Sequence, residues 1–70
     1  MPILFAPLNV ELQVTKINVP DETKHHLANL GVLVGALLVV IAEIHGNLII
    51  KIKDGRLAIN KDIAMKILVA

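Results

Sequence analysis

Several residue types that carry chemistry in proteins are missing from this 70-residue sequence, which has no cysteine, serine, tyrosine or tryptophan. Without cysteine there is no disulfide bond and no Cys-x-x-Cys pair to hold zinc. The common hydroxyl and thiol nucleophiles are absent as well, and neither Thr15 nor Thr23 has a base placed beside it by the spacing. The sequence therefore predicts a protein that is not an enzyme and has no obligatory cofactor.

Charge of one sign and aromatic rings, the two features of nucleic-acid-binding surfaces, are also scarce. Seven Lys and Arg residues against six Asp and Glu residues give a net charge of +1, and Phe5 is the only aromatic residue. Proteins that bind single strands combine a basic groove with aromatic faces on which bases stack. We therefore expect no nucleic-acid partner, and an RNA-binding barrel of the Sm type has little support.

The sequence has no apolar run long enough to cross a bilayer. The longest run, from Leu30 to Ala42, is shorter than the about 20 residues that a spanning helix needs, and Glu43 and His45 follow it. The first residues, from Met1 to Phe5, lack the charged n-region of a signal peptide. These features predict a core element rather than a membrane span, and a cytoplasmic protein.

Aliphatic residues are present in excess. Hydrophobic residues make up 56% of the chain, above the about 45–50% of ordinary soluble domains. A chain of this length forms one domain, residues 1–70, and buries about 60% of its unfolded surface. Because most of the apolar residues are Leu, Ile, Val and Ala, the composition favours strands that pack closely on one another.

The first strand is predicted from Val10 to Ile17, where apolar and polar residues alternate. The residues before it have little periodicity, and we expect Phe5 and Leu8 to cover the core as a lid. A helix is predicted to begin at Asp21, whose carboxylate can accept from the free N–H groups of the first turn. Gly31 closes this helix, because glycine readily takes the left-handed conformation after a last turn.

A second strand, predicted from Leu37 to Ile44 after a turn at Gly35, is apolar on both faces. A strand with one face in water normally alternates between apolar and polar residues. Three large aliphatic side chains on the outer face exceed what the core requires, so this face is expected to meet a partner surface. The predicted inner row is Leu38, Val40, Ala42 and Ile44, and the predicted outer row is Leu37, Val39, Ile41 and Glu43.

The rest of the chain alternates short strands with turn signals, of which Asp54-Gly55 is the strongest. Because closing a short sheet removes its exposed edges, the pattern predicts an all-β fold: a small five-stranded SH3-like barrel with one short helix after the first strand. The remaining predicted elements are a turn at His45–Asn47, strands at Leu48–Lys53, Arg56–Ile59 and Lys66–Val69, and a helical turn capped by Asn60.

Short segments spread over the whole chain carry a family resemblance. They are Ala6-Pro7-Leu8, Leu27-Ala28-Asn29-Leu30-Gly31, Gly35, the segment from Gly46 to Lys53, Arg56-Leu57-Ala58-Ile59 and the segment from Ile63 to Ile67. In this order and spacing they resemble the FeoA family (ferrous iron transport protein A). The resemblance implies a small cytosolic accessory or regulatory protein of ferrous iron transport. Such a protein acts by contact with the FeoB-type permease and is peripheral to the membrane only through that partner.

The chain departs from the family pattern at a few positions. The family usually has an arginine where this chain has His26 and a proline where it has Val34, and polar residues are usual at the positions of Leu37 and Val39. These departures leave the expected fold intact. They make the outer face of the second strand more apolar than usual, and they put in doubt any partner contact that needs the arginine.

An alternative is a transition-metal-binding or metal-sensing module for Fe²⁺ or Zn²⁺, because the chain also resembles the SH3-like domain of DtxR-type repressors. Glu43 and His45 lie two apart on a predicted strand and so point the same way, which makes them half of a possible metal site. A charged strand end and a turn histidine explain the same residues more simply. His25 and His26 point about 100° apart on a helix and cannot easily chelate one ion.

Apolar residues near the helix end and on the outer row are the predicted partner-binding surface. The core can need Leu30 alone from the helix end; core packing explains Leu27, Leu30 and Leu33 more simply, and a small exposed patch that docks a partner is the alternative. Exposed aliphatic rows also favour self-association, so we expect a homodimer or a higher oligomer. The predicted partner-binding residues are Leu27, Leu30, Leu33, Leu37 and Val39.

Overall fold

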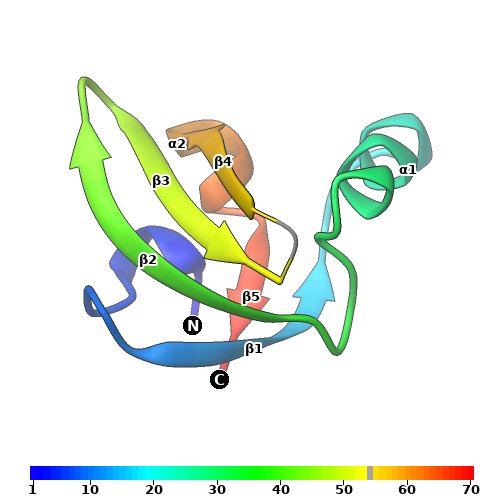
Figure 1. Ribbon diagram of the computed structural model, residues 1–70. Coiled ribbons are helices and arrows are strands. Elements are labelled where there is room, and N and C mark those ends of the chain that lie inside the picture. Colours follow the sequence, from blue (N-terminus) through cyan, green and yellow to red (C-terminus); the bar gives the residue numbers. More distant parts are fainter. Residues whose placement is uncertain (54) are drawn as a thin grey trace.

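In the computed structural model, which describes residues 1–53 and 55–70, five strands curl around one core (Figure 1). One helix follows the first strand, as predicted. The strands are β1 (Glu11–Ile17), β2 (Leu37–Ile44), β3 (Asn47–Ile52), β4 (Gly55–Asn60) and β5 (Ile67–Val69). The helical segments are the 3-10 turn η1 (Ile3–Phe5), α1 (Asp21–Asn29) and α2 (Lys61–Ala64).

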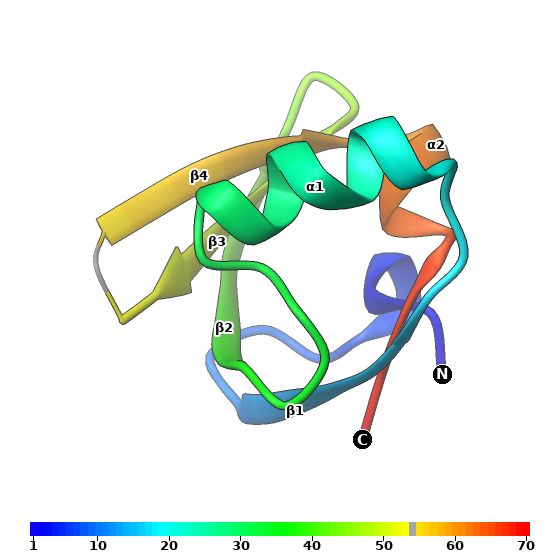
Figure 2. The ribbon, with the colours of Figure 1, turned by 90° about the vertical axis from the view of Figure 1, so that its right-hand side faces the viewer.

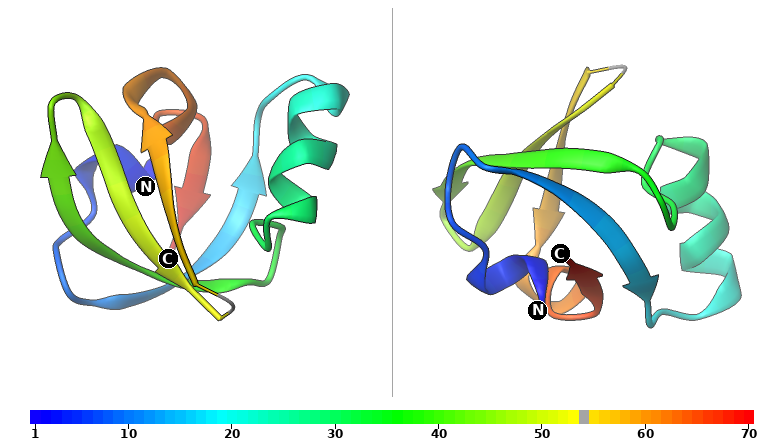
Figure 3. Two further views of the ribbon diagram at one scale, coloured as in Figure 1. Left: turned by 45° about the horizontal axis from the view of Figure 1, so that its top comes forward. Right: turned by 90° about the horizontal axis from the view of Figure 1, so that it is seen from below.

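The strands form one antiparallel sheet in the order β4-β3-β2-β1-β5, and Figure 3 shows how strongly it curves. β1 changes partner along its length: its first three residues pair with β2, whereas Val14 to Ile17 pair with β5. The register shifts between Val14 and Lys16, and such a bulge bends a strand and increases its twist. In the described residues no pairing joins the end strands β4 and β5, which α2 connects.

A second irregularity in β2 changes which residues face the core. Val40 and Ala42 pair with the consecutive residues Ile50 and Ile49, so Ile41 is an extra residue in β2. Directly paired residues of an antiparallel ladder share a face, and consecutive residues of β3 point to opposite faces. Ala42 therefore shares the outer face with Ile49, and the prediction that the inner row continues past Val40 was wrong.

Aliphatic side chains from every element fill the core, and none of the described polar or charged side chains is buried. Fully burying one Val, Leu or Ile side chain contributes about 1.5–3 kcal/mol to the free energy of folding. The buried aliphatic residues therefore provide most of the stability of the fold. They are Ile3, Leu12, Val14, Ile17, Leu27, Val32, Leu38, Val40, Leu48, Ile50, Ile52, Ile59, Ala64, Ile67 and Val69.

The predicted lid was wrong in its residues. Phe5 is 67% exposed and Leu8 is 52% exposed, whereas Ile3 is completely buried. A single short 3-10 turn such as η1 can point only some of its three side chains toward the core. In η1 the buried residue is Ile3, Leu4 packs partly buried against the core, and the aromatic ring of Phe5 stays largely in water.

The end of α1 is a Schellman motif. The Val32 N–H donates to the Leu27 carbonyl at 2.9 Å and the Gly31 N–H donates to the Ala28 carbonyl at 3.0 Å. Gly31 has φ 101°, which confirms the predicted glycine stop. The motif folds Val32 back against the core beside Leu27. Val32 thus takes the core position that the sequence had assigned to Leu30.

Among the described helices, none is both long enough and apolar enough to cross a bilayer.

Figure 2 shows α1 beside the curved sheet, joined to β2 by a long loop. That loop contains Gly35, whose N–H donates to the Val14 carbonyl at 2.8 Å. The turn predicted at Gly35 is therefore fixed against β1, and it sets the point at which β2 begins.

Two of the predicted turns are visible in full. His45 and Gly46 have φ values of 50° and 83°, the pattern of a type I′ hairpin turn. The predicted hairpin is therefore confirmed. Its two left-handed residues are His45 and Gly46, and Asn47 is not one of them. The Asn60 side chain accepts from the Ile63 N–H at 2.9 Å and caps α2 as predicted. In the Asp54-Gly55 turn, Asp54 lies outside the described residues.

Candidate functional site

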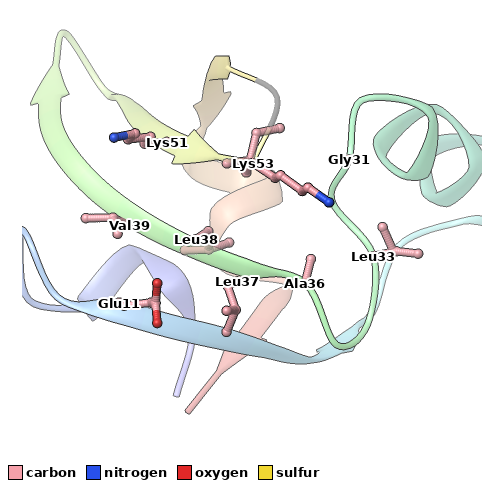
Figure 4. Close-up of a pocket in the computed structure, with 10 residues that line it drawn as sticks. Glu11, Gly31, Leu33, Ala36, Leu37, Leu38, Val39, Lys51 and Lys53 are labelled. Carbon is pink, nitrogen blue, oxygen red and sulfur yellow. The ribbon is translucent and has the colours of Figure 1, made fainter.

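An open groove of about 580 Å³ lies on the outer face of the sheet, where β1, β2 and β3 meet the α1–β2 loop (Figure 4). We call it the outer groove. β2 runs through it, and the loop after Gly31 forms its wall on the α1 side. Its lining residues are Glu11, Gly31, Leu33, Ala36, Leu37, Leu38, Val39, Lys51, Ile52 and Lys53.

The surface of the outer groove is mainly apolar. Leu33 of the loop is 48% exposed and Leu37 at the start of β2 is 52% exposed, whereas Val39 is half-buried. Val34, next to Leu33 in the loop, is 55% exposed. Isolated exposed leucines are normal on protein surfaces, but several gathered around one concave site mark an interaction surface.

Charged side chains border the outer groove on two sides. Glu11 lies on β1. Lys51 lies on β3, and Lys53 is the first residue after that strand (Figure 4). The strand register places four residues in one row across the sheet, because Glu11 pairs with Val39, Val39 with Lys51, and Lys51 with Arg56. The row therefore reads acidic, apolar, basic, basic from β1 to β4.

Three of the five predicted partner-binding residues come together here: Leu33, Leu37 and Val39 all line the outer groove. Leu30 is 39% exposed but is not part of the lining. Leu27 is only 4% exposed because it packs in the core, so its assignment to an accessible surface was wrong. The structure thus divides the predicted set into a groove, a neighbouring surface residue and a core residue.

The proposed half of a metal site loses its geometric basis. His45 lies in the β2–β3 turn with φ 50° rather than on the strand, so the argument that it points the same way as Glu43 was wrong. Glu43 instead faces Lys61 of α2, with 3.6 Å between Oε1 and Nζ. In the part of the chain that the structure describes, no three or more His, Cys, Asp or Glu residues form a group that could hold a metal ion.

The charged border of the outer groove was missed by reasoning from the sequence. Lys51 and Lys53 alternate with Ile50 and Ile52, which predicted only that the lysines face water. Their approach to Leu33, Leu37 and Glu11 depends on the pairing of β2 with β1 and β3. The opposite charges of Glu11 and Lys51 are visible in the sequence, but only the strand register shows that the two residues lie in one row across the groove.

The fold and the site can be compared with known proteins. A family model described as the FeoA domain matches residues 1–70. The chain belongs to the FeoA domain family. A curated relative from Methanocaldococcus jannaschii, named "Putative Fe(2+) transport protein A", is 35% identical over 68 residues, which is 97% of this chain and 83% of the relative.

Solved FeoA structures share the fold. A crystal structure of an iron uptake regulatory protein (FeoA) superposes with a TM-score of 0.85 at 26% identity, over 99% of this chain and 92% of that one. The solution NMR structure of the FeoA protein from Chlorobium tepidum gives a TM-score of 0.91 at 20% identity, over 99% of this chain and 68% of that one. The predicted SH3-like barrel is thereby confirmed.

Proposed function

We propose that this protein is an accessory or regulatory component of ferrous iron transport that acts by contact with the cytosolic side of a FeoB-type permease. Its membership of the FeoA domain family and the name of its relative in Methanocaldococcus jannaschii support the link to iron transport. The observation that carries the contact mechanism is the outer groove, where Leu33 and Leu37 remain about half exposed in the folded chain.

The proposed action is binding rather than catalysis. The sequence has no cysteine, serine or tyrosine, and the Thr15 hydroxyl already donates to the Leu68 carbonyl at 3.2 Å. The proposal assigns no resident metal, and Fe²⁺ enters it only as the cargo of the permease. The protein itself would act in the cytoplasm and reach the membrane only through its partner.

The test is capture of the purified cytosolic domains of the permease by the wild-type protein and by a Leu37→Asp variant. An aspartate at this position leaves the core untouched but places a charge in the outer groove, so we expect binding to weaken at least about tenfold. Circular dichroism and thermal unfolding report whether each variant is folded.

Ile44→Asp is the matched control, because Ile44 lies on the same strand, is also 52% exposed and does not line the outer groove. It should bind like the wild-type protein. Equal binding by Leu37→Asp and the wild type would remove the outer groove from the contact. The absence of any binding by the wild type to the permease domains would overturn the proposed function itself.

A further inference from the structure

The outer groove is electrically asymmetric. On its β3 side Lys51 and Lys53 line the groove, and Arg56 stands next to Lys51 in the register of β3 and β4. On its β1 side the charged lining residue is Glu11. Between the two sides lie aliphatic side chains. A ligand that fills this groove therefore meets positive charge along one flank and negative charge along the other.

These charges are available to a ligand. The ion pair found within the described residues joins Lys61 to Glu43, away from the outer groove. Glu11, Lys51 and Lys53 therefore form no ion pair with one another or with another described side chain. All three are exposed, so pairing them with a partner needs little desolvation of buried charge, and complementary charges at the rim of an apolar site give specificity and faster association.

We propose that the outer groove binds an amphipathic segment of the permease whose apolar stripe is flanked on one side by carboxylates. The apolar stripe covers Leu33, Leu37 and Val39, and the carboxylates face Lys51, Lys53 and Arg56. Glu11 repels carboxylates from the β1 side, so the charges also select one orientation of the segment. This inference rests on the proposed function and names the chemistry of the partner at the same site.

The position of the groove limits the form of its ligand. The groove lies on the face of the sheet, and β2 at its centre is already paired with β1 and β3. An extended segment cannot add to the sheet there as a further strand, because that requires a free strand edge. A helix that lays an apolar stripe into a groove needs no such edge. The segment is therefore expected to bind as a short amphipathic helix.

The test uses synthetic 20-residue peptides that tile the cytosolic sequence of the permease, measured by fluorescence anisotropy at low and high salt. Wild-type protein is compared with the double variant Lys51→Glu/Lys53→Glu. The control is Lys16→Glu/Lys66→Glu, which makes the same change in net charge at exposed positions outside the groove. Binding should select acidic amphipathic peptides, fall with salt, and weaken about tenfold in the groove variant alone.

A complementary peptide sharpens the experiment. Replacing the carboxylates of the best-binding peptide by lysines should abolish binding to the wild type and restore it to Lys51→Glu/Lys53→Glu. Equal loss in both double variants would mean that net charge, not the groove, attracts the peptide, and would overturn the inference. Binding of vesicles of anionic phosphatidylglycerol, but of no peptide, would assign the groove to a membrane surface instead.

The two proposals fail separately. If Leu37→Asp weakens capture of the permease domains while Lys51→Glu/Lys53→Glu captures them like the wild type, the groove is the contact and its preference for an acidic segment is wrong. If the wild type captures no permease domain, the proposed function fails, whatever the charged variants do with peptides.

Discussion

At the scale of single residues, the most instructive positions are two leucines three places apart. Leu27 was assigned to the partner-binding surface, and Leu30 both to that surface and to the core. In the structure Leu27 is 4% exposed and Leu30 is 39% exposed. Both lie on nearly the same side of a helix, so periodicity does not separate them. The difference arises from Val32, which the chain brings back against the core immediately after Gly31.

We expect Leu27→Ala to lower the free energy of unfolding by about 2–4 kcal/mol, because it leaves a cavity in the core. Leu30→Ala removes a side chain that is largely in water and should cost less than about 1 kcal/mol. Urea denaturation followed by circular dichroism measures both values. Equal losses would show that the two leucines share the core, contrary to their exposures.

At the scale of elements, the join between α1 and β2 decides where the outer groove forms. Two glycines with positive φ shape this join: Gly31 at φ 101° ends the helix, and Gly35 at φ 93° starts the approach to β2. They differ in surroundings. A Cβ on Gly31 would lie 3.1 Å from Cδ1 of Ile52, whereas a Cβ on Gly35 would meet no atom within 4 Å.

Gly31→Ala is therefore expected to destabilise the protein more than Gly35→Ala. Both substitutions force alanine into the left-handed region, at a cost of about 1 kcal/mol. The first adds a close contact with Ile52, which lies in the core. Thermal unfolding should show the larger fall in Tm for Gly31→Ala, and since about 1 kcal/mol corresponds to about 4–8 °C in a domain of this size, the difference is measurable. A larger fall in Tm for Gly35→Ala would mean that the Ile52 side chain moves aside at no cost.

Elements with local signals could be predicted from the sequence, and elements set by long-range pairing could not. Gly31 as a helix stop, Asn60 as a cap and the alternation of β1 each depend on a few neighbouring residues, and each is confirmed. The extra residue Ile41 depends on how β2 meets β3, which no local pattern records. The charged border of the outer groove was missed for the same reason, because Lys51 and Glu11 meet only through the register.

At the scale of the whole molecule, the exposed aliphatic side chains exceed what a single copy buries. Leu33, Val34 and Leu37 are all about half exposed, and neither η1 nor α1 covers them. Apolar surface gathered in this way lowers its free energy when a second surface removes it from water. The expectation that the chain self-associates is therefore retained. Because a second copy would cover the same outer groove, we expect self-association and binding of the permease segment to exclude one another.

Light scattering over a range of concentrations should detect a dimer or larger species of the wild-type protein. Leu37→Asp should shift the distribution to monomer, since a charge at this place opposes burial of the contact. Ile44→Asp should leave the distribution unchanged. A monomer at all concentrations would show that these side chains stay exposed to water in a single copy. The outer groove would then bind only a partner other than a second copy.

The change of partner along β1 also governs the order in which the sheet can be completed. β2, β3 and β4 pair in chain order with their neighbours in sequence, whereas the hydrogen bond from Thr15 to Leu68 joins residues 53 positions apart. Closing a loop of that length costs more chain entropy than closing a hairpin. The three-strand meander can thus assemble from nearby residues, but β1 acquires its second neighbour only when the last strand arrives. We therefore expect the pairing of β1 with β5, which draws the two ends of the chain together, to form late in folding.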